Sequence, residues 1–176
     1  MVEETETPKP YELLDDGFEH PRCAVLLIGC GNPLRGDDAA GPVLVRRLWE
    51  RDALPPTVRL ADGGTSGMDV AFQMRHADRV IIVDAASTGA APGTVYRVPG
   101  EALEQLPPVT GIASHDFRWD HAIAIGRWLL GPLMPERIDV FLIEGRDFGF
   151  GESLSPEMDA AIDRVADLVL AECVDG

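Results

Sequence analysis

Short apolar runs alternate along the chain with stretches that have helical periodicity. Five of the runs predict β-strands, at residues 23–29, 57–61, 79–83, 94–98 and 138–143. The runs at 23–29 and 79–83 contain almost no polar residues, which is typical of strands buried on both faces of a parallel sheet. Residues 94–98 alternate between polar and apolar, so we expect this strand at an edge of the sheet.

The segments between these runs predict helices. One should begin between Asp38 and Pro42, because Val43, Leu44 and Leu48 then share an apolar face. Further helices are expected through residues 68–74, from about His115 to Leu130, and from Ser155-Pro156 onward, where serine caps the helix and proline takes its first turn. We therefore predict an α/β fold, a three-layer sandwich with a mostly parallel (mixed) sheet of about five strands and helices on both faces.

Length and charge limit the domain organisation and the partners. The 176 residues suit one domain, which we place at residues 23–176, and residues 1–22 form an acidic N-terminal extension that we expect to be partly mobile. The net charge of −15 repels phosphate backbones and anionic lipid, so no nucleic-acid or membrane partner is expected. No apolar surface pattern is left over, and we expect a monomer.

The cysteines indicate the compartment. Cys23, Cys30 and Cys173 show neither a metal-binding spacing nor an even count, and the polar start of the chain does not resemble a secretory signal. A cytoplasmic protein is therefore expected. The tryptophans, Trp49, Trp119 and Trp128, are interpreted as packing residues.

Acidic residues follow several of the predicted strands. Asp38, Asp62, Asp84 and Glu144 each come at or soon after the end of one. Since the carboxyl ends of parallel strands share one edge of a sheet, these acids should gather there, and close carboxylates repel unless a proton or a cation lies between them. With His115 at a helix start, two carboxylates and an imidazole would suit nickel, zinc or iron and leave positions open for a substrate.

The same segments carry a family resemblance. Gly31-Asn32-Pro-Leu34-Arg-Gly-Asp37-Asp38-Ala-Ala-Gly41 resembles the GNxLxxDDGxG motif of hydrogenase maturation proteases. Asp62-Gly63-Gly64-Thr65-Ser-Gly67 resembles the DGGTxG motif of that family, Val83-Asp84-Ala85 its third motif, and Ser114-His115 the segment that bears its histidine. The order and spacing match from about Ala24 to the C-terminus, with Ala39 in the place of a usual glycine.

The resemblance implies an endopeptidase, metal-dependent and aspartic in type, that removes the C-terminal extension of the nickel-containing hydrogenase large-subunit precursor. It implies that Asp38, Asp84 and His115 are the catalytic and metal-binding residues. Their nickel is carried by the substrate, although other divalent ions could occupy the site. The loop Asp62-Gly63-Gly64-Thr65 would bind the substrate.

Several alternatives stay open at this stage. Asp38 could simply favour the start of a helix, Asp62 could make a turn, and Asp84 could cap a loop. His115 could be a polar surface group. A nickel-dependent checkpoint or binding protein of hydrogenase assembly, without cleavage, would need the same ligands. A nucleotide-binding Rossmann-like domain is disfavoured, because the third glycine of its fingerprint is missing and Asp37 and Asp38 would repel a pyrophosphate.

Overall fold

The computed structural model describes residues 22–103 and 119–174. The N-terminal extension, apart from Arg22, and the segment that contains His115 lie outside the described residues. Within the described part, no helix has both the length and the apolar character needed to cross a bilayer.

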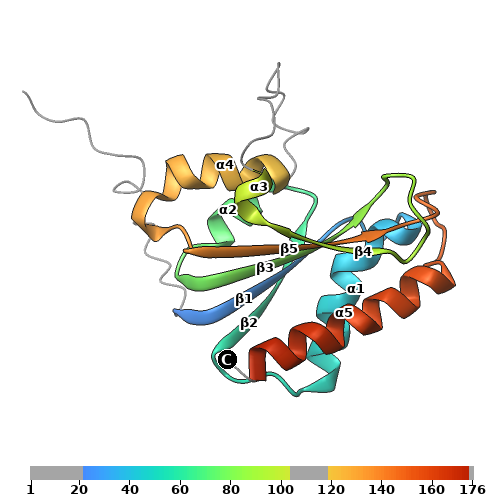
Figure 1. The fold of residues 1–176 in the computed structure, drawn as a ribbon, viewed down its shortest axis with the longest axis horizontal. Coiled ribbons are helices and arrows are strands. Elements are labelled where there is room, and N and C mark those ends of the chain that lie inside the picture. The colour runs from blue at the N-terminus through green and yellow to red at the C-terminus, as the bar shows by residue number, and fades with distance from the viewer. Residues whose placement is uncertain (1–21, 104–118, 175–176) are drawn as a thin grey trace, which may run out of the picture.

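A five-stranded sheet forms the middle layer, and all five predicted strands are present. The strands are β1 (Cys23–Cys30), β2 (Val58–Gly64), β3 (Ala77–Ala86), β4 (Val95–Pro99) and β5 (Arg137–Glu144). Their order is β2-β1-β3-β5-β4, with only β4 running antiparallel to its neighbour (Figure 1). The alternating run at 94–98 therefore lies at the edge, as its pattern predicts.

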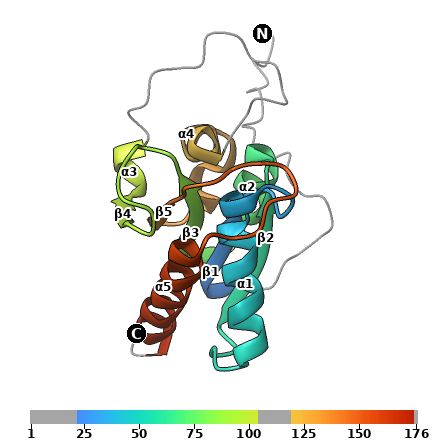
Figure 2. The same cartoon turned by 90° about the vertical axis from the view of Figure 1, so that its right-hand side faces the viewer.

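Helices cover both faces of this sheet. On one face lie α1 (Ala40–Arg51), preceded by the 3-10 turn η2 (Gly36–Ala39), and α5 (Pro156–Val174). The other face carries α2 (Gly67–Gln73), α4 (Trp119–Leu130) and the short α3 (Gly100–Leu103), and η3 (Gly131–Leu133) follows α4 (Figures 1 and 2). The predicted three-layer α/β fold is thus confirmed.

The period of two along the central strands explains why they are apolar throughout. Successive side chains of a strand point to opposite faces. Leu27 therefore joins the core under α1 and α5, whereas Leu26 and Ile28 join the core under α2 and α4. All three are fully buried, and each such side chain contributes about 1.5–3 kcal/mol to stability.

Two tryptophans differ from expectation. Trp49 and Trp128 were expected to pack, but they are 75% and 70% exposed. On α1, the inward positions repeat at Leu44 and Leu48, so the 3.6-residue period turns Trp49 away from the sheet.

Candidate active site

The parallel strands bring several acids to one edge of the sheet. Asp38 lies in the turn after β1, Asp62 lies near the end of β2, Asp84 lies near the end of β3, and Glu144 is the last residue of β5. Since β1, β2, β3 and β5 run in the same direction, all four residues lie toward the carboxyl edge. This edge is where open α/β sheets bind ligands.

Gly31 lies close to both Asp38 and Asp84. Its φ is +129°, and a Cβ added there would lie 1.9 Å from the backbone oxygen of Asp38 and 3.5 Å from Asp84 Oδ1. Only glycine leaves room at this point. The backbone of Asp38 and the carboxylate of Asp84 therefore both lie beside residue 31, just after the end of β1.

Backbone donors orient both carboxylates. The N–H of Asn32 donates to Asp38 Oδ2 at 3.2 Å, and the N–H of Ala85 donates to Asp84 Oδ1 at 2.8 Å. Asp84 is 4% exposed, whereas Asp38 is half-buried. Both carboxylates thus lie near residues 31 and 32, and carboxylate oxygens are ligands that suit a divalent cation.

The Asp62 loop lies beside the turn after β1. The N–H of Gly31 donates to the Gly64 carbonyl at 2.9 Å, and Asp62 Oδ1 accepts the N–H of Gly64 at 2.9 Å. Gly63 is the extra residue of a bulge opposite β1, and a Cβ on it would lie 2.9 Å from the buried Cys30 sulfur. Asp62 and Thr65 are exposed, so the loop offers polar groups beside Asp38.

The third predicted ligand, His115, lies outside the described residues. Among residues 22–103 and 119–174, no group of three or more His, Cys, Asp or Glu side chains is arranged to hold a metal. The metal set of Asp38, Asp84 and His115 therefore stays a prediction.

The role of Asp37 was not predicted from the sequence. Its buried carboxylate accepts the N–H groups of Arg146 at 2.7 Å, Asp147 at 3.1 Å and Ser155 at 2.7 Å, and also the Ser155 hydroxyl at 2.9 Å. Burial alone would raise the pKa of Asp37, but these four donors together hold it below its usual value. Asp37 is thus a fixed anion that ties η2 to the loop between β5 and α5. The only sequence signal was the acid pair itself, because the donors lie more than a hundred positions away.

Glu144 is also committed to the fold. Its oxygens accept the N–H of Thr88, the hydroxyl of Thr88 and the N–H of Gly89, each at 2.8 Å. Burial would raise the pKa of Glu144, and these hydrogen bonds lower it below its usual value. We therefore assign Glu144 to holding the loop after β3, and not to the metal set.

Comparison with known proteins identifies the family. A family model described as hydrogenase maturation protease matches residues 42–172, which is most of the chain. The chain belongs to the hydrogenase maturation protease family. The family that the motifs indicated is thereby confirmed. The matched range includes Asp62, Asp84 and His115, and begins shortly after Asp38.

Several family relatives cover most of the chain. A hydrogenase expression/formation protein HupD of Rhodobacter capsulatus is 31% identical over 79% of the chain and 66% of its own length. HoxM of Azotobacter vinelandii is 30% identical over 66% of the chain and 60% of its own length. The chain thus spans slightly less than two thirds of these two relatives. A putative hydrogenase maturation protease of Methanocaldococcus jannaschii is 30% identical over 84% of the chain and 95% of its own length.

Solved structures of the family share the fold. The hydrogenase maturating endopeptidase HybD of Escherichia coli superposes with a TM-score of 0.71 and 28% identity, covering 86% of this chain and 92% of that one. The [NiFe] hydrogenase maturation protease HycI of Thermococcus kodakarensis gives a TM-score of 0.65 with 21% identity, over 88% and 94% of the two chains. The second likeness supports the fold alone.

Proposed function

We propose that this chain is an endopeptidase that removes the C-terminal extension of a nickel-containing hydrogenase large-subunit precursor. Membership of the hydrogenase maturation protease family supports the reaction class. The observation that carries the proposal is that Asp38 and Asp84 both lie beside residues 31 and 32 at the carboxyl edge of the sheet, with the Asp38 carboxylate on the N–H of Asn32 and the Asp84 carboxylate next to Gly31.

In this proposal the nickel belongs to the substrate. Asp38, Asp84 and His115 contact it, since carboxylate and imidazole ligands suit this ion. A precursor that carries nickel can make this contact and a nickel-free precursor cannot. The contact therefore distinguishes the two and places one peptide bond next to the site. Such positioning can supply a large part of the barrier reduction.

The loop Asp62-Gly63-Gly64-Thr65 is proposed to hold the substrate chain. Gly64 has a φ of +52°, and no atom lies within 4 Å of the position where a Cβ would stand. A peptide backbone could therefore approach the loop closely at Gly64. The exposed Asp62 and Thr65 offer hydrogen-bonding groups on either side.

The chemistry required is the addition of water across one peptide bond. The water oxygen joins the carbonyl carbon, the carbon–nitrogen bond breaks, and the released nitrogen gains a proton. A carboxylate can orient the attacking water and accept its proton, which is the role open to Asp38 or Asp84. We further propose that the protein acts as a monomer in the cytoplasm.

The test replaces the proposed ligands one at a time. Asp38→Asn, Asp84→Asn and His115→Ala should each abolish processing of a nickel-loaded precursor, as measured by intact mass. Glu50→Gln is the control, because this exposed acid lies on α1 and takes no part in the site. Circular dichroism should show a native fold in all four. Normal processing by the His115 variant would refute the ligand assignment.

A further inference from the structure

Two loops are joined beside Asp38. Residues 31–37 follow β1, and residues 145–155 connect β5 to α5; Figures 1 and 2 show them side by side. The Arg35 Nε–H donates to the Phe148 carbonyl at 3.2 Å, the N–H of Gly151 donates to the Leu34 carbonyl at 2.8 Å, and the N–H of Asp37 donates to the Asp147 carbonyl at 2.7 Å. With the four bonds to the Asp37 carboxylate, these contacts make one unit, here named the two-loop platform (residues 31–37 and 145–155).

Close backbone packing adds to this connection. Gly36 has a φ of +50°, and a Cβ at that position would lie 2.6 Å from the Asp147 carbonyl oxygen. The two loops therefore touch backbone to backbone. Loops held in this way have little backbone freedom left to lose on binding.

The platform carries two large apolar side chains in solvent. Leu34 is 59% exposed and Phe150 is 80% exposed, and a backbone hydrogen bond joins Leu34 to Gly151, the residue after Phe150. The other large apolar side chains that are exposed in the described residues, Trp49, Trp128, Leu168 and Val174, lie on α1, α4 and α5. Leu34 and Phe150 differ from these residues because they lie on the platform next to the candidate site: Leu34 is four residues before Asp38 in the same turn.

We propose that Leu34 and Phe150 form a docking contact for the nickel-loaded hydrogenase large-subunit precursor. This inference rests on the proposed function, because a folded precursor that brings a peptide bond to Asp38 must come against the loop that carries Asp38. A few anchor residues carry most of the binding energy of a protein interface, and aromatic residues such as Phe are enriched in interfaces. The contact adds affinity for the precursor without taking part in bond cleavage.

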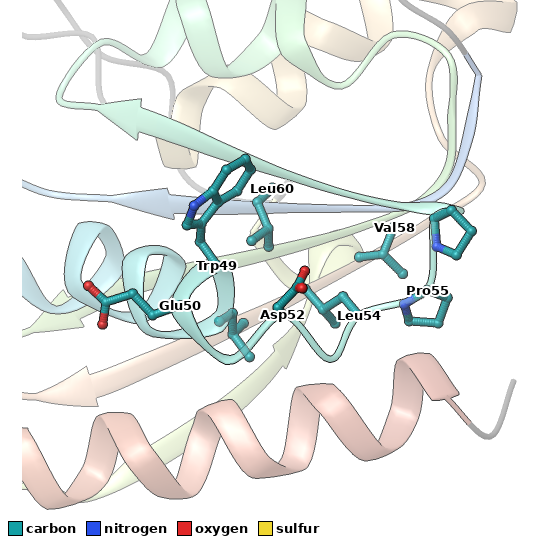
Figure 3. A pocket seen from close by; sticks show the side chains of 9 residues that line it. Trp49, Glu50, Asp52, Leu54, Pro55, Val58 and Leu60 are labelled. Atoms are coloured by element: carbon teal, nitrogen blue, oxygen red, sulfur yellow. The ribbon is translucent and has the colours of Figure 1, made fainter.

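A pocket elsewhere on the molecule provides a matched control. It has a volume of about 640 Å³ and is lined by Trp49, Leu54, Val58 and Leu60, among others (Figure 3). Val58 is the first residue of β2, so this pocket lies toward the amino end of the sheet, away from the carboxyl edge with Asp38 and Asp84. Trp49→Ser therefore removes an exposed aromatic side chain of similar size far from the platform.

The experiment compares Leu34→Ser, Phe150→Ser and the double variant with Trp49→Ser. Processing of nickel-loaded precursor is followed by intact mass to obtain kcat and KM. Binding of the same precursor is measured by interferometry in a His115→Ala background. We expect the double variant to raise both KM and Kd at least about tenfold, with kcat changed less than about twofold, whereas Trp49→Ser changes neither constant. Because both side chains are exposed, their replacement should leave the fold intact.

The two readouts separate this inference from the proposed function. If the native chain does not process the precursor but the double variant loses binding, the protease proposal fails and the docking contact stands. Unchanged KM and Kd in the double variant would overturn the docking contact while leaving the protease in place. A dimer of the native chain that Phe150→Ser converts to a monomer, by analytical ultracentrifugation, would also overturn it, because the pair would then join two copies of this chain.

Discussion

Two adjacent aspartates differ in their surroundings. Asp37 holds two loops together, whereas Asp38 is the one that we propose contacts the substrate. Asp37 is buried and accepts four hydrogen bonds, whereas Asp38 is half-buried, lies beside Gly31 as Asp84 does, and accepts the N–H of Asn32. Sequence could show that an acid pair begins the helix. It could not show which member faces the core, because that depends on the distant loop 145–155.

Asp37→Ala should destabilise the protein far more than Asp38→Ala. Loss of the Asp37 carboxylate leaves three N–H groups and one hydroxyl of the 145–155 loop without their acceptor, which costs about 3–5 kcal/mol. Asp38→Ala should cost about 1 kcal/mol, because the half-buried Asp38 carboxylate accepts the N–H of Asn32. Urea unfolding at pH 7 measures both, and equal losses would show that Asp37 does not hold the loops together.

Gly31→Ala should disturb the site itself. A methyl group there would overlap the Asp38 backbone oxygen, at 1.9 Å, so the turn bearing Asp38 must shift and processing should be lost. Gly89→Ala is the control, because Gly89 also has a positive φ, +88°, but no atom lies within 4 Å of its added Cβ. The control should cost only about 1 kcal/mol of unfolding free energy and retain processing. Full processing by the Gly31 variant would contradict the close approach of Asp38 and Asp84 around residue 31.

Among the elements, an ion-pair cluster links three strands to the end of α5. Arg79 of β3 contacts Asp139 of β5 and Glu172 of α5, and Arg97 of β4 contacts the same two acids. Burial would raise the pKa of Asp139 and of Glu172, but the arginine contacts, led by Arg79, hold both pKa values below their usual range. Removing one partner of such a buried ion pair is strongly destabilising, because the other charge is left unpaired.

The stability of the fold should therefore fall in acid. Carboxyls with lowered pKa values in the folded state contribute stability that is complete above their unfolded pKa values, about 4, and is lost as the pH falls through the folded values. We expect the urea-unfolding free energy to be nearly constant from pH 7 to 5 and to drop below about pH 4. Asp139→Asn should cost about 3 kcal/mol at pH 7 and make the acid drop smaller. A stability that increases between pH 5 and pH 3 would contradict the lowered pKa values.

At the scale of the whole molecule, the sequence predicted the layers well. The run at residues 23–29 was apolar at every position because β1 is central, and the fold sets Leu27 and Leu26 against helices on opposite faces. Residues 94–98 alternated because β4 is at the edge. The exposure of Trp49 follows from the helical period of Leu44 and Leu48 and could have been predicted. The pairing of loops 31–37 and 145–155 depends on contacts between distant segments and had no local signal.

The sheet brings Asp38 and Asp84 to its carboxyl edge, and we propose that the chain acts there on a nickel-bearing precursor. The most direct measurement is to mix the protein with nickel-loaded and with nickel-free large-subunit precursor and to compare the products by intact mass. We predict that a C-terminal peptide is lost from the nickel-loaded precursor alone. Binding without cleavage would contradict the protease and favour a checkpoint protein, and cleavage without nickel would contradict the role given to Asp38, Asp84 and His115.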